Sequence, residues 1–296
     1  MKVELLVDAK ARLGECALWC DRTHRLWWTD IESRTISSAD GRGGDLRQWT
    51  LPDRVGSFAL CEQEGLLLLG LASGIALFDT TSATMSAVVP VEMPGPEARI
   101  NDGRCDAQGR FVFGLFNGAT DNAPICPFFR VDARLRVERL PLPQVCVANS
   151  LAFGADGTRL YFTDSPAREI WCCEYFADGR IGSPRSFARV PRSQGFPDGA
   201  TVDSEGGLWS AQWQGGCVVR YDEAGNETAR VALPASQVTC PYFGGSSLDR
   251  LFATTARTGL DEADLLVQPT EGAIFVASGV GWTGLPERRF ATDLRT

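Results

Sequence analysis

The sequence predicts an all-β fold, a six-bladed β-propeller with four-stranded antiparallel blades. Three observations lead to this prediction: an apolar strand motif recurs along the chain, polar turns precede most copies, and no amphipathic helical period is visible. The second residues of the six copies are Trp27, Leu67, Phe111, Tyr161, Trp209 and Phe252. Their spacings of 40, 44, 50, 48 and 43 residues are those of propeller blades.

Each copy consists of a tight turn followed by a strand with a buried character. The turns at 106–109, 155–158 and 203–207 supply the Asp and Gly residues that hairpins require. Several copies continue into a second strand after a short break, as at 74–79 and 216–221. A unit of this length with several strands is typical of a four-stranded blade.

Two strand-like segments are left over at the ends of the repeat array. Residues 272–276 follow the sixth copy, and residues 3–7 precede the first. We expect residues 3–7 to complete the last blade and so to close the ring. Two β-sandwiches in tandem are the alternative, but they would require no regular period. The sequence therefore predicts a single domain over residues 1–296.

Composition narrows the classes of partner. The chain has 296 residues, 44% of them hydrophobic and 22% charged, which is ordinary for a globular protein. Its net charge of −8 would repel nucleic acid and anionic lipid surfaces, so neither partner is expected. No apolar run is long enough to span a bilayer, and residues 1–10 alternate charged and apolar side chains. We expect a cytoplasmic monomer or weak dimer that acts on a small molecule.

Cysteine and histidine exclude several kinds of site. The ten cysteines mostly lie in apolar strand-like runs without a Cys-x-x-Cys pair, so we expect reduced core thiols. His24 is the only histidine and lies in a turn. The sequence therefore disfavours Ser-His-Asp and Cys-His hydrolases and histidine-rich zinc sites. Any chemistry must use carboxylates, amides or a hard metal ion.

Polar residues recur in one phase of the repeat. Glu15, Asn101, Asn149 and Asp198 each lie 10 to 12 residues before the aligned position of their repeat. Equivalent positions in different blades face the same axis, so these side chains can converge there. Glu15, Asn149 and Asp198 would offer two carboxylates and an amide oxygen, ligands that suit a divalent cation. The alternative for each residue is a turn or strand-end cap.

At these positions the sequence resembles the SMP-30/gluconolactonase/regucalcin-like family of sugar lactonases. The resemblance covers essentially the whole chain and depends on segments 13–19, 28–31, 99–103, 149–157, 196–199 and 237–245. It implies that Glu15, Asn149 and Asp198 bind one divalent metal ion, with calcium, zinc, manganese and iron(II) all compatible. It also implies that Arg99 and Asn101 hold the substrate and that Asp198 is the catalytic general base.

Some positions depart from the family pattern. Cys16 follows the metal-binding glutamate where glycine is common, and we expect its thiol to point away from the metal. Ser150 replaces the usual glycine after Asn149. In the loop after the third repeat strand, Asn117 and Asp121 are candidate substrate-binding residues, without a clear match to the acidic residue of some relatives.

The resemblance implies hydrolysis of a sugar aldonolactone, with L-arabinono- or D-xylonolactone favoured. Phe116 and Trp213 are candidates for an apolar wall under the sugar, whereas Trp28 is expected to pack in the core. Two alternatives remain open. One is a calcium-binding regulatory propeller without catalysis, and the other is an aryl-ester or organophosphate hydrolase.

Overall fold

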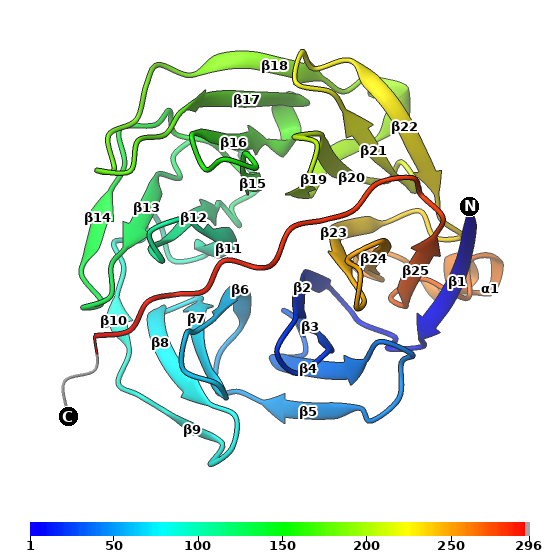
Figure 1. Ribbon diagram of the computed structural model, residues 1–296, viewed down its shortest axis with the longest axis horizontal. Helices are drawn as coiled ribbons and strands as arrows, with labels where there is room; N and C mark the ends of the chain where they lie inside the picture. The colour runs from blue at the N-terminus through cyan, green and yellow to red at the C-terminus, as the bar shows by residue number, and fades with distance from the viewer. Residues whose placement is uncertain (294–296) are drawn as a thin grey trace.

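The computed structural model describes residues 1–293 and arranges their strands in six sheets around one axis (Figure 1). The first three blades are β2 (Gly14–Cys20), β3 (Arg25–Asp30), β4 (Thr35–Asp40) and β5 (Arg47–Thr50); β6 (Val55–Leu60), β7 (Leu66–Leu71) and β8 (Gly74–Asp79) with β9 (Thr84–Met85) and β10 (Val89–Pro90); and β11 (Arg99–Cys105), β12 (Phe111–Phe116), β13 (Phe128–Val131) and β14 (Val137–Arg139). The predicted six-bladed, antiparallel fold is confirmed.

The other three blades follow the same order from the axis outward. They are β15 (Ala148–Phe153), β16 (Arg159–Asp164), β17 (Glu169–Glu174) and β18 (Arg185–Arg189); β19 (Phe196–Val202), β20 (Leu208–Trp213), β21 (Cys217–Tyr221) and β22 (Glu227–Ala232); and β23 (Val238–Gly244), β24 (Arg250–Thr255), β25 (Ile274–Ser278) and β1 (Lys2–Val7). The six repeat copies found in the sequence are the second strands of the six blades.

The N-terminal strand closes the ring, as the sequence predicts. In Figure 1, β1 lies at the outer edge of the last blade. It pairs antiparallel with β25, with Val3 opposite Ala277 and Leu5 opposite Phe275. The last blade therefore combines the N-terminal strand with three strands from the end of the repeat array, and β1 gives the edge of β25 a hydrogen-bonding partner.

Every inner strand contains a β-bulge or comparable irregularity. The pairing of the first and second strands shifts register in each of the six blades. Cys16 and Ser150 lie at two of these shifts with positive φ angles of 50° and 54°. Bulges re-aim side chains at the ends of strands, and here they recur at the end of the ring where the polar residues gather.

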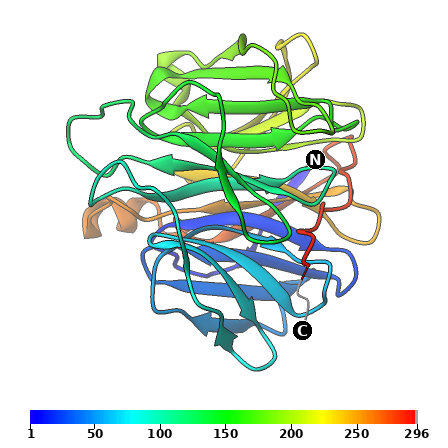
Figure 2. The same cartoon turned by 90° about the vertical axis from the view of Figure 1, so that its left-hand side faces the viewer.

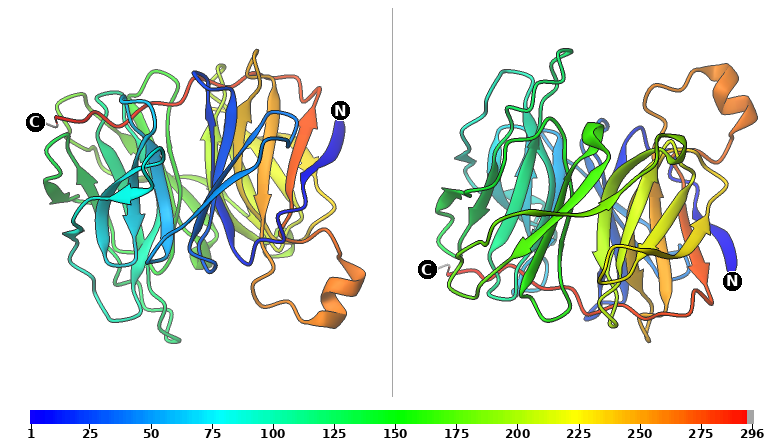
Figure 3. Two further views of the ribbon diagram at one scale, coloured as in Figure 1. Left: turned by 90° about the horizontal axis from the view of Figure 1, so that it is seen from below. Right: turned by 90° about the horizontal axis from the view of Figure 1, so that it is seen from above.

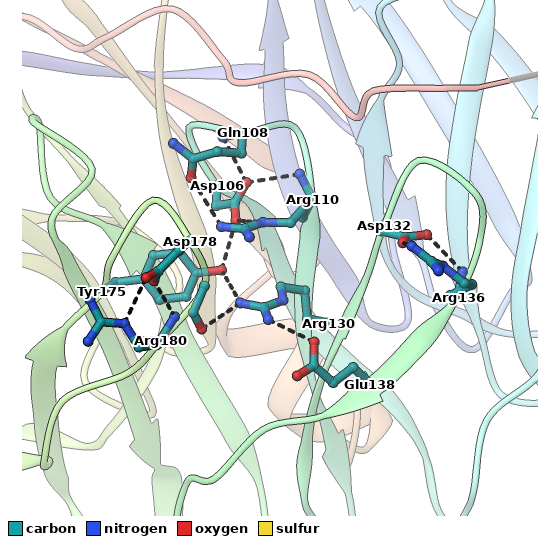
Figure 4. A network of polar contacts seen from close by, with 11 residues as sticks. Asp106, Gln108, Arg110, Arg130, Asp132, Arg136, Glu138, Tyr175, Asp178 and Arg180 are labelled. Atoms are coloured by element: carbon teal, nitrogen blue, oxygen red, sulfur yellow. Dashed lines mark hydrogen bonds and ion pairs between the residues drawn. The ribbon is translucent and has the colours of Figure 1, made fainter.

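Apolar packing between neighbouring blades forms the core. Aromatic side chains such as Trp209, Phe111 and Tyr161 are buried between the sheets. All ten cysteines are buried and free. A polar network adds to the contact of blades three and four (Figure 4): the Tyr175 hydroxyl donates to Asp106 Oδ2 at 2.7 Å and accepts from Arg130 Nη1 at 3.1 Å.

The C-terminal segment crosses one face of the ring. Figure 1 shows it running over the centre, and Figures 2 and 3 show that it and the helix α1 (Glu262–Val267) lie on opposite faces. Phe290 of this segment is fully buried, and Glu287 pairs with Arg104 at the far end of an inner strand. The segment therefore covers one mouth of the central channel.

The sequence did not predict the helix α1, which lies between β24 and β25. It has only six residues, too few to show a helical period, and a capping box of Asp261 and Asp264 begins it. Short 3₁₀ turns occur at Ser165–Ala167 and Arg192–Gln194. Within residues 1–293, no helix has the length and apolar character needed to cross a membrane.

Candidate active site

A cavity of about 290 Å³ lies where the inner strands begin, at the opposite end from the C-terminal segment. Its wall contains charged, amide and aromatic side chains from the first, third, fourth and fifth blades, and the sixth blade contributes Thr258. The lining residues are Leu13, Glu15, Arg99, Asn101, Phe116, Val147, Asn149, Ser165, Pro166, Phe196, Asp198, Trp213 and Thr258. The structure thus brings Glu15, Arg99, Asn101, Asn149 and Asp198 into one cavity.

The local fold explains why these residues meet. Glu15 and Asn149 precede the register shifts of β2 and β15, and Asn101 and Asp198 lie within those of β11 and β19. Placement at the same register shift in four blades gives the phase found in the sequence a structural basis. Ser150, which directly follows Asn149, adopts a left-handed conformation with a φ of 54° that favours glycine, the residue expected at this position from the sequence resemblance.

The two carboxylates of the cavity repel each other in a buried environment. Burial, together with the charge of Asp102, raises the pKa of Glu15 to about 8. Burial and the charge of Glu15 raise the pKa of Asp198 well above its usual range. Arg99 is the cation near both carboxylates, and burial lowers its own pKa to about 10. One arginine therefore offsets only part of the negative charge.

Asp198 also has an unsatisfied oxygen. Its side chain is 5% exposed, and Oδ1 has no hydrogen-bond partner among residues 1–293. A buried acceptor without a partner calls for an explanation, and a bound ion or water is one that the neighbouring ligands support. Two buried carboxylates and the Asn149 amide oxygen are a donor set suited to a divalent cation, so the residues fit the expected metal.

The amide side chains are connected in series. Asn101 Nδ2 donates to Asn149 Oδ1 at 3.1 Å, and Asn101 Oδ1 accepts from Arg99 Nη1 at 2.5 Å. The Arg99 guanidinium lies over the ring of Phe116, with 4.6 Å between its carbon and the ring centroid. Asn101 therefore holds both Asn149 and Arg99 in place.

Cys16 points away from the cavity. Its Sγ lies 3.3 Å from Ser57 Oγ and accepts from Phe58 N at 3.4 Å, both in the next blade. Burial raises the pKa of this thiol to about 12, so it stays protonated. The direction agrees with the prediction, although a bulge with positive φ, rather than simple strand alternation, produces it.

Two predicted substrate-binding residues lie outside the cavity wall. Asn117 Nδ2 donates to Asp121 Oδ1 at 3.2 Å and to Ala123 O at 3.0 Å, so both side chains shape their own loop. A direct contact of Asn117 or Asp121 with substrate stays a prediction. Phe116 and Trp213 line the cavity, whereas Trp28 is buried in the core.

Sequence reasoning missed Ser165 and Thr258 of the cavity wall. Ser165 directly follows the fourth repeat strand, and a search for polar residues after each repeat strand would have found it. Thr258 lies in the insertion between β24 and β25, which has no counterpart in the repeat and therefore gave no signal.

Comparison with known proteins shows the family of the chain. Residues 13–257 match the SMP-30/Gluconolactonase/LRE-like region. The chain belongs to this SMP-30/gluconolactonase family. The family relatives include an L-arabinolactonase of Azospirillum brasilense, 44% identical over 97% of this chain and 95% of the relative.

Other members of the SMP-30/gluconolactonase family match over nearly their whole length. Pentonolactonase XacC of Haloferax volcanii is 33% identical over 100% of this chain and 99% of its own. The crystal structure of a calcium-binding protein, regucalcin, of Agrobacterium tumefaciens superimposes with a TM-score of 0.90. It is 28% identical and covers 97% of this chain and 96% of its own.

Proposed function

We propose that the protein is a metal-dependent lactonase that hydrolyses a sugar aldonolactone to the aldonic acid, with a pentonolactone such as L-arabinono- or D-xylonolactone preferred. The observation that carries the proposal is the pair of buried carboxylates, Glu15 and Asp198, with an unpartnered Asp198 oxygen in a cavity that also holds Arg99. The similarity to an L-arabinolactonase supports the substrate class.

Glu15, Asn149 and Asp198 would hold the cation. A divalent ion bound there supplies Lewis acidity toward the lactone carbonyl and lowers the pKa of a water molecule. Among residues 1–293, no three His, Cys, Asp or Glu side chains form a metal site, and the set proposed here instead joins two carboxylates to an amide. Oxygen ligands suit calcium and manganese(II), and zinc and iron(II) also accept them.

The residues of the cavity then divide the work of hydrolysis. Asp198 Oδ1 takes a proton from the water that attacks the carbonyl carbon. The same carboxyl returns that proton to the ring oxygen as the bond between the acyl carbon and the ring oxygen breaks. The Arg99 guanidinium, whose Nε has no partner among the described residues, stabilises the negative charge that develops on the carbonyl oxygen.

The remaining wall selects a small substrate. Phe116 and Trp213 offer apolar surfaces to the face of a sugar ring. A cavity of about 290 Å³ suits one sugar ring rather than an oligosaccharide. The proposal includes a cytoplasmic enzyme that acts as a monomer or weak dimer on a small-molecule lactone, and it includes no nucleic-acid or membrane partner.

A calcium-binding protein without catalysis is the second candidate function. The similarity to a solved calcium-binding protein, regucalcin, favours it. Both candidates require cation binding, so only turnover distinguishes them.

The deciding experiment measures acid release from a panel of pentono- and hexonolactones. Chelator-treated protein should be inactive, and a single added divalent ion should restore turnover. Asp198→Asn should lower kcat by about 10²-fold or more, because it removes both the general base and a charged ligand. Asp178→Asn, on an exposed turn of blade four, is the matched control and should retain activity. Cation binding without turnover of any lactone would favour the regulatory protein instead.

A further inference from the structure

Ser165 lies in the cavity wall, yet no step of the proposed reaction uses it. It begins the 3₁₀ turn after β16 and is 8% exposed. Its hydroxyl contacts the side chain of Asn149 in its own blade and the backbone of Pro197 in the next blade. Pro197 directly precedes Asp198, so the hydroxyl links the segments that carry two of the proposed ligands.

The partners of Ser165 fix where its single hydroxyl proton points. Ser165 Oγ lies 2.7 Å from Pro197 O, and a backbone carbonyl can only accept a hydrogen bond. The hydroxyl proton is therefore donated to Pro197 O. Ser165 Oγ lies 2.9 Å from the Asn149 amide and must accept there, so the Asn149 group facing it is the NH₂.

Arg99 fixes the other end of the hydrogen-bonded series formed by Arg99, Asn101 and Asn149. The Arg99 guanidinium can only donate, so the Asn101 atom 2.5 Å from Arg99 Nη1 is the oxygen. The Asn101 NH₂ then donates to Ala148 O at 2.8 Å and to the Asn149 oxygen at 3.1 Å. Both amides are thus oriented by groups that can only donate or only accept a hydrogen bond. The hydrogen-bond network therefore assigns the oxygen and the nitrogen of each amide.

We propose that Ser165 is a positioning residue that orients the Asn149 amide with its carbonyl oxygen toward the cation. A flipped Asn149 would set its NH₂ against that of Asn101 and its oxygen against a hydroxyl whose proton is already donated. Each unsatisfied buried group of this kind costs about 1–3 kcal/mol. In the observed orientation, one lone pair of Asn149 Oδ1 accepts from Asn101 and the other is available to a metal.

The inference rests on the cation site of the proposed function, and it can be tested separately. The matched variants are Ser165→Thr and Ser165→Val. Threonine keeps the hydroxyl, and valine has nearly the same shape as threonine but lacks the hydroxyl. Ser150→Ala is a second control, because Ser150 donates across the same blades to Asp198 O at 2.6 Å but makes no hydrogen bond to the Asn149 amide among residues 1–293.

The experiment titrates chelator-treated protein with Mn²⁺ alone and measures its dissociation constant by calorimetry. Ser165→Val should weaken Mn²⁺ binding about tenfold, the usual effect of losing a group that orients a ligand. Ser165→Thr should stay within about threefold of the parent protein, and so should Ser150→Ala. At saturating Mn²⁺, the kcat of Ser165→Val should recover to within a few-fold.

A change of the ligand itself provides the sharpest check. In Asn149→Asp, the two carboxylate oxygens are equivalent and need no orientation. Adding Ser165→Val to Asn149→Asp should therefore change Mn²⁺ affinity less than about threefold. Thermal unfolding of each metal-free variant shows that it is folded, and Ser165→Ala replaces Ser165→Val if the larger side chain does not fit.

Three results would overturn the inference. The first is equal Mn²⁺ affinity of Ser165→Val and Ser165→Thr. The second is a loss of Mn²⁺ affinity in Ser150→Ala as large as that in Ser165→Val. The third is a tenfold loss when Ser165→Val is added to Asn149→Asp. A parent protein that binds no divalent cation would instead overturn the proposed function, and that result needs no Ser165 variant.

Discussion

At the scale of single residues, the site holds two buried carboxyl groups whose ionised forms are only partly compensated by Arg99. Burial raises the pKa of both Glu15 and Asp198, and the charge of Glu15 raises the pKa of Asp198 further. Such an arrangement is unfavourable to the folded protein alone and favourable once a cation is bound. Stability and metal binding should therefore be linked through the same two carboxyl groups.

This linkage predicts a pH dependence in the absence of metal. The pKa of Glu15 is about 8 in the folded protein against an ordinary 4.5, so the folded state holds the proton more tightly than the unfolded state. The free energy of unfolding should then fall as pH rises from about 5 to 8. Denaturant unfolding in the presence of a chelator, at several pH values, measures the trend.

Glu15→Gln is the matched variant for that measurement. It removes the titrating carboxyl and its repulsion of Asp198, so its stability should fall less over the same pH range. A saturating divalent ion should raise the free energy of unfolding of the parent protein most at the high end of this pH range. Parallel pH profiles for the parent protein and Glu15→Gln would contradict the linkage.

At the scale of elements, the sixth blade holds the ring together through β1. Val3 packs against the cluster of Ala235, Ala273 and Phe275, whereas Leu5 of the same strand is 45% exposed. The two residues lie in one strand, and Val3 is partly buried whereas Leu5 is exposed. Substitutions of the two residues therefore distinguish the side-chain packing of β1 from its backbone hydrogen bonds.

We predict that Val3→Asp destabilises the fold by about 1–2 kcal/mol, because it places a carboxylate against an apolar cluster. Leu5→Asp should change stability by less than about 0.5 kcal/mol. Equilibrium unfolding of both variants at fixed metal concentration makes the comparison. Equal effects would mean that blade closure depends on backbone pairing alone. Neither residue lines the cavity, so kcat should be unchanged where both are folded.

At the scale of the whole molecule, the two ends of the channel have different roles. One end opens at the carboxylates, and the C-terminal segment covers the other. Arg104 Nη1 lies 3.4 Å from Glu287 Oε2, and both side chains are almost fully buried. This ion pair joins the C-terminal segment to the third blade.

Removal of one partner should be costly. Glu287→Ala leaves the buried Arg104 without its carboxylate and should destabilise the protein by about 3–5 kcal/mol. The double variant Arg104→Met/Glu287→Leu should recover most of that loss, since buried pairs are replaceable by apolar side chains. Thermal and denaturant unfolding measure both. A loss below about 1 kcal/mol for Glu287→Ala would show that the segment is held by Phe290 and its other contacts.

The sequence by itself determined the ring and the common phase of the proposed metal ligands. The repeated strand is a local pattern, so its six copies were visible without any structure, and the phase of Glu15, Asn149 and Asp198 followed from it. The common phase leads to one cavity because every blade presents its inner strand to the same axis. The chemical roles of these residues stay predictions until the assays above are made.

Only the tertiary structure decided the features that depend on contacts between blades. The bond from Ser165 to Pro197, the entry of Thr258 into the cavity wall and the crossing of the channel by the C-terminal segment follow no period. The mutual bond of Asn117 and Asp121 likewise depends on the shape of one loop. A repeat fixes where its own members lie, whereas hydrogen-bond partners and irregular segments are fixed by the packing of the completed ring.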